Sequence, residues 1–111
     1  MEQGEKTVAQ WRSQIDILDS ELLRLLNERA RIASELGALK VSSGLPVYDG
    51  RRERQILTRL CDSNTGPLDR ESITSIFRCI IRESRRLEIS QQNASSKSQY
   101  KQSSEEFGHG H

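Results

Sequence analysis

Residues 11–40 have the sequence WRSQIDILDSELLRLLNERARIASELGALK and carry the most regular hydrophobic pattern in this chain. Apolar side chains recur there, mostly in steps of three and four, at Trp11, Ile15, Leu18, Leu22, Leu25, Ile32, Leu36 and Leu39. This spacing is typical of an amphipathic helix with one apolar stripe. From Thr7 to Val41 there is no proline, and the only glycine is Gly37. The pattern therefore predicts one long helix over these residues.

The length of this helix bears on assembly. A helix of about 35 residues is about 50 Å long, because each residue adds about 1.5 Å. A compact domain of this chain's size is only about 35 Å across, so the chain alone cannot cover the whole stripe. A second copy of the chain is the simplest cover. The sequence therefore predicts a homodimer.

The rest of the ordered chain predicts two further helices. Residues 41–48, VSSGLPVY, contain Gly and Pro and interrupt the first helix. Asp49 is a suitable N-cap for a short helix over about residues 50–61, and Asp69 is a suitable N-cap for a medium-length third helix. No segment alternates like a β-strand. We expect an all-α chain with a long, a short and a medium helix.

Composition divides the chain into two parts. Leu, Ile, Val and Phe total 26, and all of them except Phe107 lie in residues 1–89. We expect residues 1–89 to form one folded domain. In residues 90–111, Ser and Gln account for ten of 22 positions, and we expect this segment to be a disordered tail.

Charge and composition exclude several classes of function. A net charge of +1 does not suit a general nucleic-acid binder. No apolar run is long enough to span a membrane, and no secretion signal precedes the first helix, so we expect a cytoplasmic protein. Cys61 and Cys79 are too few for a disulfide framework, and His109 and His111 lie in the expected tail. We expect neither a metal nor a cofactor.

Charged and hydroxyl side chains interrupt the apolar stripes. Arg29 occupies the next stripe position after Leu25, and Lys40 lies on nearly the same face about 16 Å further along. In the third helix the apolar face leads to Ser84 and Glu88, and the second helix opens with Asp49, Arg52 and Glu53. Each of these residues alone is more typical of a solvated helix face. Together they favour a cationic pocket for a small dicarboxylate.

Arg12 lies outside this group. It is about 25 Å along the first helix from Arg29 and about 100° around it, so one small ligand cannot contact both on the same helix. If two long helices pair antiparallel, Arg12 of one chain can reach the Arg29–Lys40 segment of the other. This predicts sites shared between two subunits.

Three blocks of sequence resemble the all-helical chorismate mutases. They are residues 12–40, RSQIDILDSELLRLLNERARIASELGALK; residues 44–53, GLPVYDGRRE; and residues 76–88, IFRCIIRESRRLE. The resemblance covers residues 11–88. It implies an intertwined dimer of three-helix chains with two equivalent buried sites. It also implies the rearrangement of chorismate to prephenate, in the shikimate pathway toward phenylalanine and tyrosine.

The resemblance also implies roles for individual residues. The carboxylate-binding arginines match Arg29, Arg52 and Arg12 of the partner subunit, and Ser84 matches a hydroxyl near the ring carboxylate. Lys40 matches the cation at the ether oxygen and a carboxylate. The contacts to the ring hydroxyl match Glu53 and the backbone of Asp49. Glu88 matches the side chain that hydrogen-bonds the ether oxygen, where some members have glutamine.

Two alternatives stay open at this point. An isochorismate-pyruvate lyase has a related helical fold and a similar pocket. A non-catalytic helical module could regulate or dock to another enzyme of the shikimate pathway, although such a module has no need of the pocket residues. The same docking is also possible for an active mutase.

Overall fold

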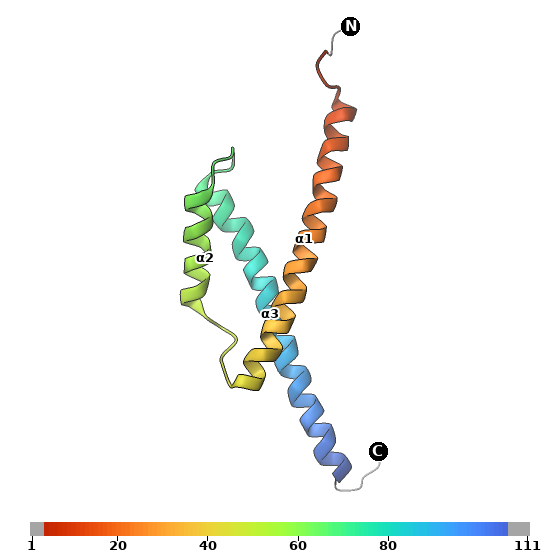
Figure 1. Ribbon diagram of the computed structural model, residues 1–111, viewed down its shortest axis with the longest axis vertical. Helices are drawn as coiled ribbons and strands as arrows, with labels where there is room; N and C mark the ends of the chain where they lie inside the picture. Colours follow the sequence, from red (N-terminus) through yellow and green to blue (C-terminus); the bar gives the residue numbers. More distant parts are fainter. Residues whose placement is uncertain (1–3, 107–111) are drawn as a thin grey trace.

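The computed structural model describes residues 4–106, in which three α-helices are present and no β-strand occurs (Figure 1). The helices are α1 (Val8–Ser43), α2 (Gly50–Ser63) and α3 (Arg70–Glu106). Side chains are described from residue 4 to residue 94. The predictions of an all-α chain and of three helices are confirmed.

Each helix begins at a capping residue, and the two predicted caps are present. The Thr7 hydroxyl caps the start of α1 in a capping box, and Gly44, in the left-handed conformation with φ 69°, caps its C-terminal end. The Asp49 carboxylate caps α2. At the start of α3, the backbone N–H of Ser72 donates to Asp69 at 2.8 Å and holds the pKa of that carboxyl below its usual range. Local sequence signals therefore set where the helices begin.

The predicted medium length of the third helix is wrong, because α3 continues to Glu106 and, with 37 residues, is about as long as the 36-residue α1. Residues 90–106 contain neither Gly nor Pro, so the local sequence offers no strong helix breaker. Beyond residue 89, the Gln91 side chain also donates to Ser34 Oγ at 2.7 Å and ties α3 to α1. The division of the chain into a catalytic part and a tail stays a prediction, and residues 107–111 lie outside the described part.

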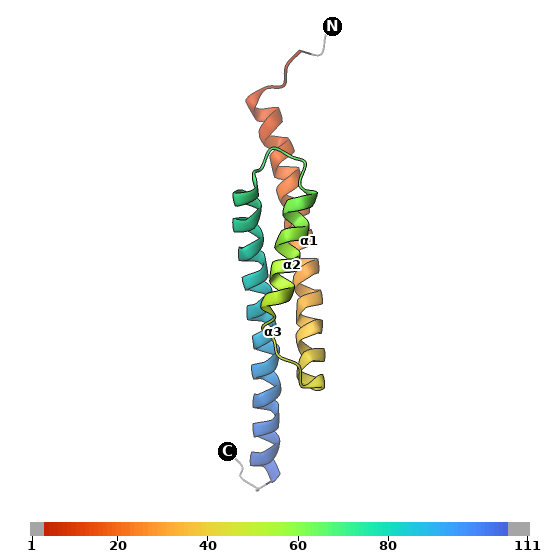
Figure 2. The ribbon, with the colours of Figure 1, turned by 90° about the vertical axis from the view of Figure 1, so that its left-hand side faces the viewer.

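The helices are arranged around α3. It packs against both α1 and α2, whereas the backbones of α1 and α2 stay apart. Figure 1 shows the C-terminal half of α1 crossing α3 near the middle of α3, with α2 beside the N-terminal half of α3. Figure 2, turned by 90°, shows how thin this arrangement is, and the molecule measures 79 × 33 × 17 Å. Side chains from all three helices can therefore meet only where α3 bridges the other two.

The single chain buries little apolar surface. Ala33, Ile56 and Ile81 are its buried hydrophobic side chains among the described residues. The side chains of the predicted stripe on α1, from Trp11 to Leu39, are 44–64% exposed. The N-terminal half of α1 extends clear of α2 and α3 (Figure 1). This agrees with the expectation that the chain does not cover its own stripe.

Within the described residues, no helix is both long and apolar enough to cross a membrane.

Gly37 permits a close contact between α1 and α3. A Cβ at this buried position would lie only 2.8 Å from the Glu88 Cα. We therefore expect Gly37→Ala to push the helices apart and to lower the free energy of unfolding by about 1–3 kcal/mol, measured by urea denaturation. The control is Gly66→Ala, because a Cβ there would be 3.8 Å from Asn64; we expect a change below about 0.5 kcal/mol. Equal stability of the two variants would contradict the close contact.

Candidate functional site

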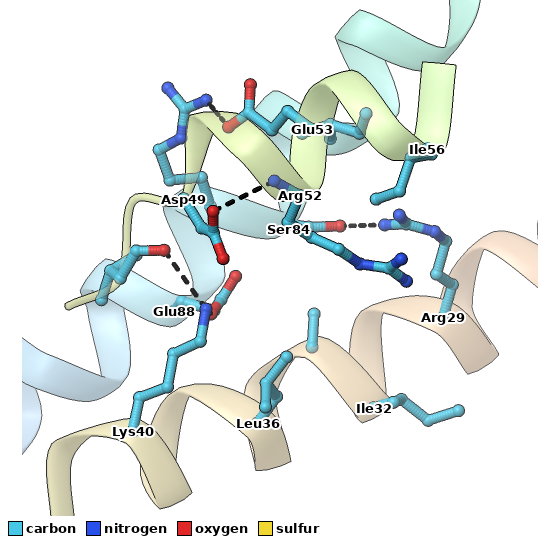
Figure 3. Close-up of a pocket in the computed structure, with 14 residues that line it drawn as sticks. Arg29, Ile32, Leu36, Lys40, Asp49, Arg52, Glu53, Ile56, Ser84 and Glu88 are labelled. Carbon is cyan, nitrogen blue, oxygen red and sulfur yellow. Dashed lines mark hydrogen bonds and ion pairs between the residues drawn. The ribbon is translucent and has the colours of Figure 1, made fainter. Parts of the chain in front are cut away.

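A cavity of about 280 Å³ lies where α3 bridges α1 and α2 (Figure 3). It is lined by seven of the eight site residues predicted from the sequence: Arg29, Lys40, Asp49, Arg52, Glu53, Ser84 and Glu88. The rest of the lining is Arg85 and the apolar residues Ile32, Ala33, Leu36, Val47, Ile56 and Ile81. The cavity therefore combines apolar walls with a dense set of charges.

Lys40 and Glu88 form an ion pair at one end of the cavity. Lys40 Nζ donates to Glu88 Oε1 at 2.7 Å and to the backbone oxygen of Val47 at 3.2 Å. The two side chains are 17% and 10% exposed, and the close approach at Gly37 brings their helices together. An ammonium group has three N–H donors. After these two bonds, Lys40 keeps one donor for a ligand.

Arg29 and Arg52 form the cationic part of the cavity. Arg29 Nη1 donates to Ser84 Oγ, and this hydroxyl donates to the backbone oxygen of Ile80 at 3.1 Å. The Arg52 guanidinium extends from α2 toward that of Arg29 (Figure 3). Neither arginine forms an ion pair with a carboxylate of the described residues. Two convergent guanidinium groups without a counterion favour an anionic ligand, and a carboxylate fits their geometry.

The N-terminus of α2 places two further groups. Asp49 Oδ1 accepts a hydrogen bond from the backbone N–H of Arg52 at 3.0 Å, which fixes the first turn of the helix. Glu53, the residue after Arg52, forms an ion pair with Arg85 of α3. Figure 3 shows the Glu53 carboxylate on the far side of the cavity from Lys40. The cavity therefore presents a hydrogen-bond acceptor opposite the Lys40–Glu88 pair.

Arg85 is a cavity residue that was not predicted from the sequence. It lies in a polar run in which four of five residues are charged, RESRR at residues 82–86, and such a run is typical of a solvated helix face. One signal was present: Arg85 is four residues after the buried Ile81 and three before the buried Glu88. These steps place all three on one face of a helix.

Arg12 is exposed and does not line the cavity. The N-terminal part of α1, to which Arg12 belongs, extends beyond the other helices (Figure 1). Arg29 follows Arg12 by 17 positions in the sequence, which correspond to about 25 Å of helix. Within one chain, Arg12 is therefore too far from the cavity to contact the same small ligand.

No metal centre is present within the described residues, since no group of three or more His, Cys, Asp or Glu side chains could hold an ion there. Cys61 and Cys79 are both free thiols. His109 and His111 lie outside the described part of the chain.

Known proteins with similar sequences include bifunctional chorismate mutases. The family model for chorismate mutase type II matches residues 11–89. The bifunctional chorismate mutase/prephenate dehydratase of Neisseria gonorrhoeae is 46% identical over 72 residues, which are 65% of this chain and 19% of that protein. The protein of the same name from Escherichia coli is 43% identical over 74 residues, 66% of this chain and 19% of that protein. This chain thus spans about a fifth of the length of these relatives.

Solved structures agree with the sequence match. Form II of the chorismate mutase from Thermus thermophilus has 38% identity and a TM-score of 0.73, covering 75% of this chain and 94% of that one. The chorismate mutase of Helicobacter pylori, solved in complex with prephenate, has 30% identity and a TM-score of 0.71, covering 78% and 93%. The resemblance drawn from the sequence is confirmed, and the chain belongs to the chorismate mutase type II family.

Proposed function

We propose that this chain catalyses the rearrangement of chorismate to prephenate. The observation that carries the proposal is the cavity, in which the guanidinium groups of Arg29 and Arg52 face the same space as the Lys40–Glu88 pair, and neither is in an ion pair within the described residues. In this reaction a C–O bond breaks while a C–C bond forms within one molecule, without a nucleophile or proton transfer. The protein therefore has to hold the reactive conformer and stabilise the charge that develops on the ether oxygen.

The substrate carries two carboxylates, and the cavity has matching cations. Arg29 and Arg52 are the proposed carboxylate ligands, each with guanidinium N–H groups left for bidentate contacts. Ser84 accepts from Arg29 and thereby holds it at the cavity wall, near the proposed position of the ring carboxylate. These contacts orient the substrate before reaction.

Lys40 and Glu88 are proposed to act at the ether oxygen. Lys40 has a free donor and also contacts a substrate carboxylate in this proposal. Glu88 accepts from Lys40 through Oε1, and a proton on Oε2 would make it a second donor to the ether oxygen. Donors that are already in position stabilise developing charge without the cost of reorganisation. At the opposite side, Glu53 and the backbone of Asp49 are proposed to bind the ring hydroxyl.

The active species is proposed to be a homodimer. The long exposed stripe of α1 is the surface that a second copy would cover. Arg12, which cannot reach its own cavity, would then enter the cavity of the other chain, so that each site contains Arg12 of the partner subunit. This would add one more positive charge to a site for a dianion.

The test is to mix the purified chain with chorismate, follow its consumption and identify the product. Prephenate is the expected product. Turnover of isochorismate to salicylate and pyruvate, without turnover of chorismate, would instead favour the lyase. Absence of both reactions from a folded protein would favour a non-catalytic module.

The role of Glu88 predicts a pH dependence. A carboxyl group donates a hydrogen bond only when protonated, and its protonated fraction falls as pH rises. We therefore expect kcat/KM to be highest at acid pH and to decline toward alkaline pH. Glu88→Gln supplies a permanent amide donor of nearly the same size, so this variant should remain active with a flatter profile between about pH 5 and 9. Rates are compared only where both proteins remain folded and of equal oligomeric state.

A flat profile for the unmodified chain, unchanged in rate and shape by Glu88→Gln, would exclude Glu88 as the ether-oxygen donor. Two other expectations stay predictions: the cytoplasmic location and a complex with another enzyme of the shikimate pathway.

A further inference from the structure

Arg85 of α3 connects two residues at the start of α2. Its Nη2 donates to the Glu53 carboxylate, and its Cζ lies 4.8 Å from the centroid of the Tyr48 ring. Its Nε is buried and has no hydrogen-bond partner among the described residues. The guanidinium is therefore held between a carboxylate and an aromatic face, a geometry that suits arginine better than lysine.

The Tyr48 ring, in a residue that is 61% exposed, lies against the start of α2. If Gly50 had a Cβ, this atom would lie only 2.6 Å from the Tyr48 hydroxyl oxygen. The ring therefore packs directly against the first residue of α2. Glu53 lies in the first turn of the same helix. Arg85 thus contacts both ends of the short segment from Tyr48 to Glu53. The position of the Glu53 carboxylate therefore depends on the position of this segment.

The charges of the cavity give a second reason for this contact. The lining contains four cations, Arg29, Lys40, Arg52 and Arg85, and three carboxylates, Asp49, Glu53 and Glu88. Without Arg85 the positive and negative charges of the lining would cancel. Glu53 would also lose its partner in a half-buried position, where its side chain is 26% exposed. A carboxylate in that state would be free to turn toward Arg52 or solvent.

We propose that Arg85 is a positioning residue, which fixes the Glu53 carboxylate as the acceptor for the substrate's ring hydroxyl. This rests on the proposed function. The Arg85 side chain is 32% exposed and touches Glu53 and Tyr48 from the α3 side. It acts on the substrate through Glu53, and its effect on turnover disappears when Glu53 cannot form the pair.

The main variant is Arg85→Met, which keeps an apolar stem against Tyr48 and removes the charge. We expect kcat/KM for chorismate to fall about ten-fold or more, since a charge-assisted hydrogen bond is lost. Arg85→Lys should recover part of this loss. The matched control is Arg86→Met, because Arg86 carries the same charge but is 72% exposed and pairs with Glu83; its kcat/KM should change less than about two-fold.

A double-mutant cycle separates positioning from other roles. In a Glu53→Gln background, adding Arg85→Met should change kcat/KM by less than about two-fold, because the pair is already gone. A full additional loss in that background would overturn the inference, since Arg85 would then act directly on the substrate or through charge alone. An unchanged kcat/KM in the single Arg85→Met variant would also overturn it.

Circular dichroism and mass measurements are needed to check that each variant is folded and of unchanged oligomeric state. If Arg85→Met does not fold, Arg85→Lys replaces it in the double-mutant cycle with Glu53→Gln. Failure of the unmodified chain to convert chorismate would overturn the proposed function and this inference together. Turnover by the unmodified chain with additive effects in the cycle would overturn this inference alone.

Discussion

Lys40→Ala is expected to lower kcat for chorismate by about 10³-fold or more in a chain that still folds. Loss of one preorganised donor to a developing oxyanion typically costs about 10²–10³-fold in rate. In our proposal Lys40 also contacts a substrate carboxylate, and this contact is lost with the same substitution. The loss should appear in kcat as well as in kcat/KM, because the donor acts most strongly in the transition state.

The ion pair calls for a specific control. Lys40→Ala leaves the Glu88 carboxyl, in a side chain only 10% exposed, without its cationic partner, and an unpaired buried charge destabilises a protein. The double variant Lys40→Ala, Glu88→Gln avoids this, because a neutral amide replaces the carboxylate. Both variants should be inactive, and thermal unfolding should show the double variant to be the more stable. A folded Lys40→Ala protein with near-normal turnover would exclude Lys40 from the chemistry.

Much of the fold could be predicted because its signals are local. The Asp49 and Asp69 caps each depend on a backbone amide within the first turn of their own helix. The apolar spacing of residues 11–40 was sufficient to identify α1. The end of α3 was less predictable, because a Ser- and Gln-rich composition indicates weak burial but does not itself end a helix. The contact of Gln91 with Ser34 joins segments 57 residues apart and has no local signal.

The candidate site could be predicted in part. Periodicity indicated that Lys40 and Glu88 each point inward, but spacing within a helix cannot show that two helices meet. The contact between α1 and α3 depends on their close approach at Gly37. From the sequence, Gly37 could be recognised only as the single glycine in a long helix. Arg85 was missed because its pairing with Glu53 is a contact between α2 and α3, whereas its own neighbours in sequence are polar and mostly charged.

The position of Arg12 leads to the second large effect, which is recovery of activity by mixing two inactive variants. In the proposed dimer, each site uses Arg29 of one chain and Arg12 of the other. Arg12→Ala and Arg29→Ala homodimers should therefore both be inactive. A mixed dimer has one site with both substitutions and one site with neither. After equal mixing and free exchange, about a quarter of the sites should be intact, and about a quarter of the unmodified activity should return.

The matched control mixes Arg29→Ala with Arg52→Ala. Both arginines line the cavity of their own chain, so every site in that mixed dimer keeps one of the two substitutions, and no activity should return. Native mass spectrometry measures the fraction of mixed dimers in each sample, which makes the two mixtures comparable. Mixed dimers of the first pair without recovery would refute a shared site. Recovery by the second pair would show that Arg29 and Arg52 serve different sites, whereas the cavity places them in one.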